Sequence, residues 1–496
     1  MISKMLFAAA GLALFLAARG ETQPVVMGIF ESHGDVGQVK HPGRVEFDPA
    51  RQTYTVTGGG ANMWGGVDAF HFVWKRLSGD AELTADIQWV GTGGNPHRKA
   101  CLVLRQSLAA DAPHVNAVTH GDGLTGLQFR RTAGGPTEEI RMALSAPQTL
   151  RIVKDGDVYT MYAARADGKL QPAGSIQASL GNEIYAGIGV CSHDDEKLET
   201  AVFSKVSMIS KSLAAGQERI VESSLEILDV ETGERTIAYQ ARRHFEAPNW
   251  SRDGRTLLFN SGGRLYTIPI EGGRPVRLDT GFADQCNNDH GYSPDGKWIA
   301  LSDQSRTQKS LIYTLPAGGG EPRLITPQGP SYWHGWSPDG RTLAYCAERN
   351  GEYDVYTIPA EGGAEIRLTD TPGLDDGPDY SPDGQWIYFN SIRSGTMKIW
   401  RMKSDGANPE AMTSDEYNDW FPHPSPDGNQ VVFLSYEPGV EGHPANKIVK
   451  IRLIPANGGE PKVLAQLFGG QGTLNVPSWS PDSRRIALVS YRLAAP

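Results

Sequence analysis

The sequence predicts an all-β protein in two parts, a β-sandwich of the jelly-roll type followed by a six-bladed β-propeller. The first observation is a motif, aromatic-Ser-Pro-Asp-Gly, that recurs in the second half of the 496-residue chain. The second is a series of short runs in the first half in which apolar and polar residues alternate, as in strands with one buried face. The third is the content of 58 Gly and 32 Pro, residue types that punctuate short strands.

The first twenty residues have the pattern of a secretory signal peptide. Lys4 precedes an unbroken apolar run at residues 5–18, and Ala18-Arg19-Gly20 places small residues at a cleavage site. The apolar run is shorter than the ~20 residues that span a bilayer. We therefore expect residues 1–20 to be removed and the mature protein to be exported, to a periplasm or beyond, without a membrane span. The alternative is an uncleaved anchor.

Charge and cysteine content narrow the range of partners. The chain has 47 Lys and Arg against 57 Asp and Glu, a formal net charge of −10, and the two signs are interspersed. A phosphate-binding face needs a basic stripe, so nucleic acid is not expected as a partner. Export permits disulfides, but the four cysteines have no CxxC spacing and lie mostly in strand-like runs. Buried free thiols are expected, with a Cys101–Cys191 bridge as the alternative.

The repeat defines the second half of the chain. Its serines are separated by 42, 44, 44, 44 and 55 residues. Each copy is followed by runs for further short strands, which gives four strands per unit, as in a propeller blade. Asp-Gly supplies the tight turn between the first two strands and Pro pre-sets its start, so the motif is interpreted as structural. The six serines are Ser251, Ser293, Ser337, Ser381, Ser425 and Ser480.

The ends of the repeat region predict how the ring closes. Only 16 residues follow Ser480, which leaves the last blade without its outer strands. Residues 225–233 match the pattern of residues 265–273, so we expect a segment before the first motif to complete the sixth blade. The longer last spacing indicates an insertion in blade five, near Glu437 to Asn446.

This pattern resembles the TolB-like (WD40-like, PD40) propeller repeats, over residues 220–496. The family also includes oligogalacturonate lyases and the propellers of prolyl-oligopeptidase relatives, so the resemblance implies a fold more than an activity. No GxSxG motif and no α/β domain follow the propeller, which excludes a prolyl-oligopeptidase. The resemblance to the lyases implies a metal held by clustered histidines. This sequence has no His-x-His cluster, so that site is not carried over.

Residues 24–212 form the predicted sandwich. Asp155-Gly156-Asp157 indicates a hairpin turn among the alternating runs. The order of the segments, which end in GIGVCSHD and AVFSKVSM, resembles the concanavalin-A-like lectin/glucanase superfamily. The resemblance implies either carbohydrate binding or a packing module. Core packing and sugar stacking compete for the aromatic segment that contains Trp64, His71, Phe72 and Trp74.

Candidate functional residues come from the loops that lead into the innermost strand of each blade, because these loops line the central funnel. Blades two and three carry His290 and His334 where other copies carry Pro, which predicts two imidazoles on one rim. The expected catalytic residues are His290, His334, Asp289 and Asp376. The expected substrate-binding residues are Asn288, Tyr332, Trp333, Asp375, Asp419, Trp420, His423, Gln471 and Asn475.

Three kinds of chemistry fit these side chains. Imidazoles with Gln471 or Asp289 would hold a divalent metal. A single histidine would act as general acid or base on a sugar. Asp375, Asp376 and Asp419 would supply the paired carboxylates of a glycosidase. The alternative is that the two histidines only shape the funnel through hydrogen bonds.

Two functions follow. The first is an exported protein that binds or processes a carbohydrate, with a polysaccharide or oligosaccharide lyase or hydrolase site in the funnel. Aromatic faces beside amides and carboxylates suit sugar hydroxyls, and the funnel loops are rich in all three. The second is a non-catalytic TolB-like envelope scaffold that binds a protein partner.

Overall fold

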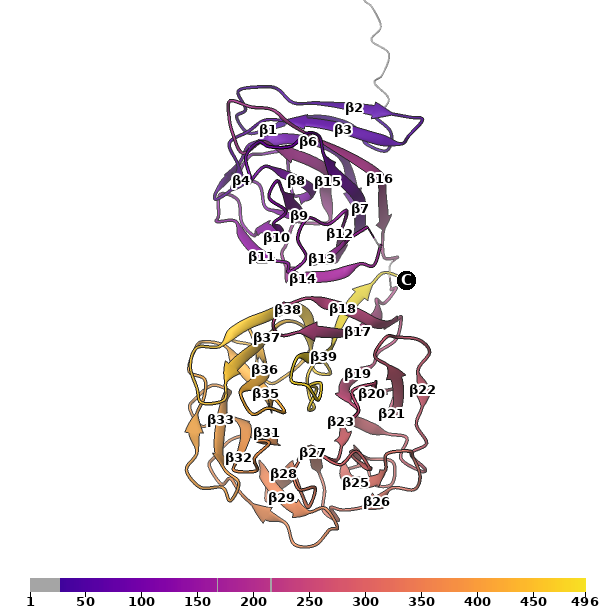
Figure 1. Ribbon diagram of the computed structural model, residues 1–496, viewed down its shortest axis with the longest axis vertical. Coiled ribbons are helices and arrows are strands. Elements are labelled where there is room, and N and C mark those ends of the chain that lie inside the picture. Colours follow the sequence, from indigo (N-terminus) through magenta and orange to yellow (C-terminus); the bar gives the residue numbers. More distant parts are fainter. Residues whose placement is uncertain (1–26, 167, 215) are drawn as a thin grey trace, which may run out of the picture.

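The computed structural model describes residues 27–166, 168–214 and 216–496, and the predicted signal peptide lies outside these residues. Figure 1 shows two units stacked along the long axis, with the N-terminal unit above a ring-shaped second unit. All regular secondary-structure elements of the described residues are strands. No helix that could cross a membrane is found among these residues. The all-β prediction is confirmed.

Two seven-stranded antiparallel sheets form the N-terminal unit. They enclose one hydrophobic core to which both contribute, with Leu102 and Ile188 from the first sheet and Leu83 and Ile152 from the second. The first sheet has the order β1 (Ser32–Val36), β6 (Phe70–Ser78), β15 (Glu183–Cys191), β8 (Lys99–Arg105), β9 (His114–His120), β10 (Thr125–Arg130) and β11 (Glu138–Arg141). The second has the order β14 (Gln171–Gln177), β13 (Val158–Ala164), β12 (Thr149–Asp155), β7 (Asp80–Trp89), β16 (Glu199–Lys211), β3 (Thr53–Gly58) and β2 (Arg44–Asp48).

The aromatic segment of this unit divides between packing and exposure. Phe72 and His71 are buried in β6, and His71 Nδ1 lies 2.7 Å from Asp35 Oδ1. Trp74 is half-buried against the hydrophobic cluster that contains Phe70 and Phe72. Trp64 is 42% exposed, in the hairpin of β4 (Met63–Trp64) and β5 (Val67–Asp68). The core interpretation therefore holds for the residues of β6 at positions 71 and 72, while Trp64 remains on the surface.

Six blades make up the second unit. Five are four-stranded antiparallel sheets, and their innermost strands surround the centre of the ring in Figure 1. Blade one comprises β19 (Glu246–Trp250), β20 (Thr256–Ser261), β21 (Arg264–Pro269) and β22 (Val276–Arg277); blade two comprises β23 (Cys286–Tyr292), β24 (Trp298–Asp303), β25 (Leu311–Pro316) and β26 (Arg323–Leu324). Blade three comprises β27 (Ser331–Trp336), β28 (Thr342–Arg349), β29 (Glu352–Pro359) and β30 (Ile366–Arg367). Blade four comprises β31 (Asp375–Tyr380), β32 (Trp386–Ser391), β33 (Lys398–Lys403) and β34 (Glu410–Ala411); blade five comprises β35 (Asn418–Pro424), β36 (Gln430–Tyr436), β37 (Ala445–Pro455) and β38 (Lys462–Gly470).

The repeated motif forms the same hydrogen-bonded turn in every blade. In blade three, Ser337 Oγ donates to Asp339 Oδ1 at 2.6 Å and accepts from the Thr342 amide at 2.9 Å. Asp339 Oδ1 also accepts from the Arg341 amide at 3.0 Å. Gly340 has a φ of 71°, a value that favours glycine. The motif is structural, as its turn chemistry predicts.

Blade six closes the ring with strands from both ends of the propeller. Strand β17 (Ile220–Asp229) pairs antiparallel with β39 (Arg485–Ala494) along its whole length, and β18 (Arg235–Ala241) lies outside β17. The innermost position is held by a single bridge between Trp479 and Ile486. The predicted closure by residues before the first motif is confirmed.

Ion pairs join the two units at this closing blade. Arg492 of β39 lies 2.8 Å from Asp155 of β12 and 3.2 Å from Glu222 of β17. Arg219 pairs with Asp80 of β7 at 2.6 Å. The N-terminal unit therefore docks on the strands that close the propeller.

The four cysteines are free and buried, so the Cys101–Cys191 bridge does not form.

Candidate active site in the propeller funnel

A cavity of about 430 Å³ lies among the inner strands of the propeller, and we call it the funnel cavity. Its walls come from blades two to five and from the segment that leads into blade six. Seven of the residues predicted from the sequence line it, namely Asn288, Asp289, Tyr332, His334, Asp376, Gln471 and Asn475. The funnel loops therefore converge on one site.

His334 and Asp376 form an ion pair across the boundary of blades three and four. His334 Nε2 lies 3.1 Å from Asp376 Oδ1, and Asp376 Oδ1 also accepts a 2.7 Å hydrogen bond from the Gly377 amide. Burial opposes charge on both groups. The attraction between them outweighs it, so the pKa of Asp376 falls to about 2 and that of His334 is raised.

Asp289 has the opposite electrostatic environment. Burial raises the pKa of its carboxyl to about 7, Asp376 adds to the increase, and His334 opposes it. Glu246, on blade one, has a pKa raised to about 7 for the same reasons, burial first and then the charge of Asp289. At neutral pH the funnel cavity therefore combines a charged carboxylate, Asp376, with a carboxyl that is partly protonated.

The part of the cavity wall from blade five and from the segment that leads into blade six carries amides and an imidazole. His443 Nδ1 hydrogen-bonds to Gln471 Oε1, which also accepts from Asn475 Nδ2 at 3.1 Å. His443 contacts the rings of Trp420 and Phe421 edge-on, with centroid distances of 4.6 and 5.2 Å. Asn475 Oδ1 accepts from the Gly472 amide at 2.6 Å. These contacts hold polar groups of two blades in place at the cavity.

Six cavity residues were not predicted from the sequence, and they are Asn287, Cys346, Tyr353, Leu374, Phe421 and His443. His443 had a signal, because it lies in the predicted insertion of blade five. Tyr353 and Cys346 belong to β29 and β28, outside the loops that lead into the innermost strands. Phe421 has a φ of 53°, a left-handed value that its sequence does not reveal.

His290 does not reach the funnel cavity, contrary to the prediction of two imidazoles on one rim. Its ring is fully buried, and burial lowers its pKa to about 4. In β27 the ladder shifts between Trp333 and Gly335, so His334 lies unpaired in a bulge. In β23 the shift falls between Cys286 and His290, so His290 pairs with Leu301. The bulge of blade two lies nearer the start of its strand, and it brings Asp289 to the cavity instead.

The other predicted residues outside the cavity have structural partners. Trp333 and Trp420 are buried in hydrophobic clusters, and Trp333 lies where a Cβ on Gly291 would meet its ring at 2.4 Å. Asp375 lies 2.8 Å from Arg393 Nη2. Asp419 accepts from Ser435 Oγ at 2.6 Å.

His423 pairs with Asp379, with 3.1 Å between Nδ1 and Oδ2. These contacts leave Asp375, Asp419 and His423 out of the cavity lining, so the predicted carboxylate trio is not assembled. Asp376 joins Asp289 there instead.

The described residues contain no group of three or more His, Cys, Asp or Glu side chains arranged to hold a metal ion. Lys and Arg are also missing from the lining of the funnel cavity, as far as the structure describes it. The side chains that are present, among them Asp289, His334 and Asp376, support proton transfer and hydrogen bonding.

Known proteins resemble part of this chain. Residues 334–486 match the family model of the TolB β-propeller domain, PD40. The uncharacterized protein Atu1656 of Agrobacterium fabrum (strain C58) is 50% identical over 286 residues, which are 58% of this chain and 98% of the relative. A structure provisionally assigned as TolB from Agrobacterium tumefaciens is 51% identical, covers 56% of this chain and 99% of its own, and has a TM-score of 0.54. TolB from Acinetobacter baumannii is 16% identical over 54% of this chain and 63% of its own, with a TM-score of 0.39.

Proposed function

We propose that this chain, which belongs to the TolB-like β-propeller family, binds a saccharide in its funnel cavity and cleaves it by acid–base catalysis. The observation that carries the proposal is the pair Asp289 and Asp376. Both line one cavity, and their surroundings move the two pKa values apart, to about 7 and about 2. Two carboxyls tuned in this way supply a proton donor and a proton acceptor at one pH.

Each side chain has a role in this proposal. Asp289 is protonated in part at neutral pH and donates a proton to the leaving oxygen. Asp376 stays charged and accepts a proton from water or from the substrate, and His334 holds this carboxylate in place. Tyr332, Tyr353 and Phe421 offer aromatic faces for a pyranose ring, and Asn288 and Gln471 offer amide groups for its hydroxyls.

The N-terminal unit and the signal sequence extend this proposal. The unit is a jelly roll of the concanavalin-A-like type that binds the same class of polysaccharide, which two seven-stranded sheets around one core support. Exposed Trp64, at 42% of its surface, is its candidate stacking residue. The signal-peptide pattern of residues 1–20 supports export to the periplasm or beyond.

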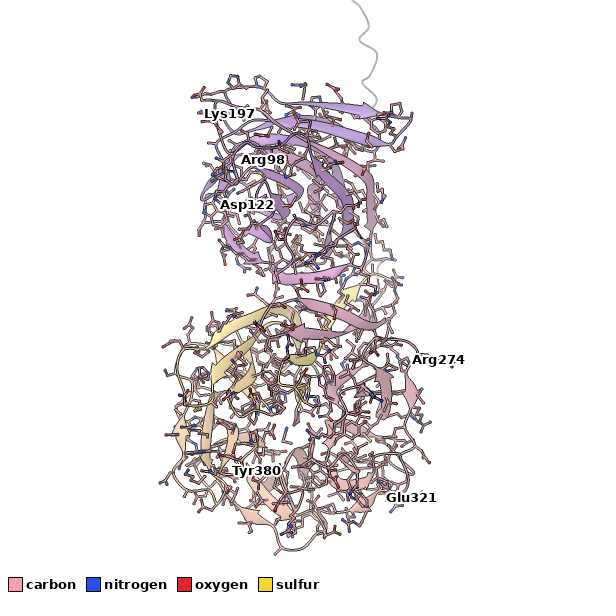
Figure 2. All side chains as sticks on the ribbon, in the orientation of Figure 1. Arg98, Asp122, Lys197, Arg274, Glu321 and Tyr380 are labelled. Carbon is pink, nitrogen blue, oxygen red and sulfur yellow. The ribbon has the colours of Figure 1, made fainter. Side chains whose placement is uncertain are left out.

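A panel of oligosaccharides tests the catalytic proposal, scored for new reducing ends and for unsaturated uronates. Asp289→Asn and Asp376→Asn should each lower cleavage by a factor of about 100 or more, the usual contribution of a general acid or base. Glu321→Gln is the matched control, because Glu321 is exposed on the outer rim of the propeller, far from the centre of the ring (Figure 2). Equal activity of the wild type and both variants would contradict the proposal.

A second function remains supported by the relatives. The structure from Agrobacterium tumefaciens carries the name TolB, which favours a propeller that binds a protein partner without catalysis. In that case the panel would yield no product. Protein capture by the propeller would then be unchanged by Asp289→Asn.

A further inference from the structure

We infer that the funnel cavity selects a sugar that carries a protonated amine, and that it rejects uronates. This inference rests on the proposed saccharide site and adds the charge of the ligand. It follows from the charged groups of the cavity, from its unpartnered polar atoms and from its aromatic rings.

The formal charges of the lining residues leave one carboxyl without a counterion. Asp376 is paired with His334 at 3.1 Å, so these two groups largely cancel. No Lys, Arg or His of the described residues lies within 4.0 Å of the Asp289 carboxylate. With no Lys or Arg in the lining as described, the cavity offers a cationic ligand the Asp289 carboxyl, which is ionised in part near neutral pH, and offers an anionic ligand neither an ammonium nor a guanidinium group.

Two unpartnered polar atoms at the cavity support a ligand there. Asn288 is 6% exposed and lines the cavity, yet its Nδ2 has no hydrogen-bond partner within the chain. His334 Nδ1 is likewise without a partner. Buried polar groups are normally satisfied, so these two atoms await groups that the chain does not supply. Hydroxyls of a sugar ring would satisfy both.

Aromatic rings favour the same sign of charge. Tyr332, Tyr353 and Phe421 line the cavity that also contains Asp289 and Asp376. The face of an aromatic ring attracts a cation, and a carboxylate beside it adds a direct ion pair. An ammonium group near Asp289 would favour the ionised carboxylate, which burial now disfavours. Asp289 would therefore act as the counterion of a ring that carries an amine and as the proton donor only toward a ring without one.

A uronate would meet the reverse conditions. Its carboxylate would lie beside Asp289 and the Asp376–His334 pair, with no Arg to accept it in the two-point geometry that such groups favour. Repulsion between two carboxylates in a partly dehydrated site opposes binding. The lining therefore argues against uronate lyase chemistry in this propeller.

Isothermal titration with three matched trisaccharides tests the inference at pH 6.5. The ligands are the glucosamine trimer, its N-acetylated form and the galacturonate trimer, which carry positive, zero and negative charge. We expect the amine to bind at least 10-fold more tightly than the acetylated trimer, and the uronate to bind most weakly. Asp289→Asn should reduce the preference for the amine to less than about 3-fold while the acetylated trimer still binds. Glu321→Gln should leave all three affinities unchanged.

The outcomes separate this inference from the proposal beneath it. Equal binding of the amine and acetylated trimers by the wild type overturns the charge selectivity and leaves the saccharide site intact. Preferred binding of the galacturonate trimer also overturns it. Failure of all three sugars to bind overturns both. The comparison of ligands uses the wild type alone, so it holds even if Asp289→Asn folds poorly.

Discussion

His334 Nε2 lies 3.1 Å from Asp376 Oδ1, and the two side chains come from the innermost strands of neighbouring blades. Both residues are buried, at 2% and 8% exposure. Their ion pair connects blade three to blade four at the funnel cavity. It also keeps Asp376 charged while Asp289, in the same cavity, has its pKa raised to about 7.

Removal of the Asp376 carboxylate should change the pKa of His334. In Asp376→Asn the pKa of His334 should fall, because Asp376 is its main raising partner and burial then dominates. A pH titration of the His334 ring signals by NMR measures this shift. Asp415→Asn, which removes a carboxylate paired with Arg452 in blade five, is the control and should leave His334 unchanged.

The raised pKa of Asp289 predicts that the stability of the fold depends on pH. A carboxyl with a raised pKa binds a proton more tightly in the folded state, so the free energy of unfolding should fall as pH rises from about 4 to about 7. A shift from 3.8 to about 7 corresponds to at most roughly 4 kcal/mol. Asp289→Asn should remove much of this slope in urea titrations at several pH values. Glu246→Gln should remove a further part, because its pKa is also about 7. A wild type whose stability rises through this window would contradict the assignment.

The repeated turn should contribute measurably to stability. Ser337→Ala removes the hydrogen bond to Asp339 and leaves the Thr342 amide without its partner. The expected loss is about 1–3 kcal/mol in the free energy of unfolding. Ser394 is exposed and bonds only to the nearby Thr396 carbonyl, so Ser394→Ala should change stability by less than about 0.5 kcal/mol. Equal effects of the two variants would mean that the turn network is dispensable.

Ring closure should depend on the segment before the first motif. Deleting residues 223–240 removes most of β17 and all but one residue of β18, which leaves β39 with a free edge, and the protein should become insoluble. A chain that begins at residue 216 keeps both strands and should be folded and monodisperse. Size-exclusion chromatography compares the two, and a monodisperse deletion variant would refute the closure.

Arg492 should hold the N-terminal unit against the propeller. Burial raises the pKa of Asp155 even with Arg492 beside it, so Arg492→Met leaves a buried carboxyl without its main partner. The expected loss of stability is about 2–4 kcal/mol, with the two units unfolding at more widely separated temperatures in calorimetry. Arg274→Met, on the exposed outer rim of the propeller (Figure 2), should leave the transitions unchanged.

Local turn chemistry made most of the propeller predictable. Ser, Asp and Gly at fixed offsets form their hydrogen bonds within six residues, so each copy of the motif marks a turn without reference to the rest of the chain. The spacing of the copies then gave the number of blades, and the shortage of residues after Ser480 gave the closing segment. The insertion near Glu437 was visible as an excess over the repeat length.

The sequence by itself determined the blades and the region of the funnel, because these follow from contacts between residues close together in the chain. It also determined the closure, because the last copy of the motif lacks outer strands and a matching segment precedes the first copy. Only the tertiary structure decided which side chains enter the cavity. His290 and His334 occupy the same position of the repeat, yet a bulge of different placement leaves one paired in its strand and frees the other. A shift of one residue turns a side chain to the other face of a strand, and the placement of a bulge depends on packing between blades. His443 reaches the site from an insertion. Its ring contacts Trp420 and Phe421 and hydrogen-bonds to Gln471, and all three of these residues lie far from it in the sequence.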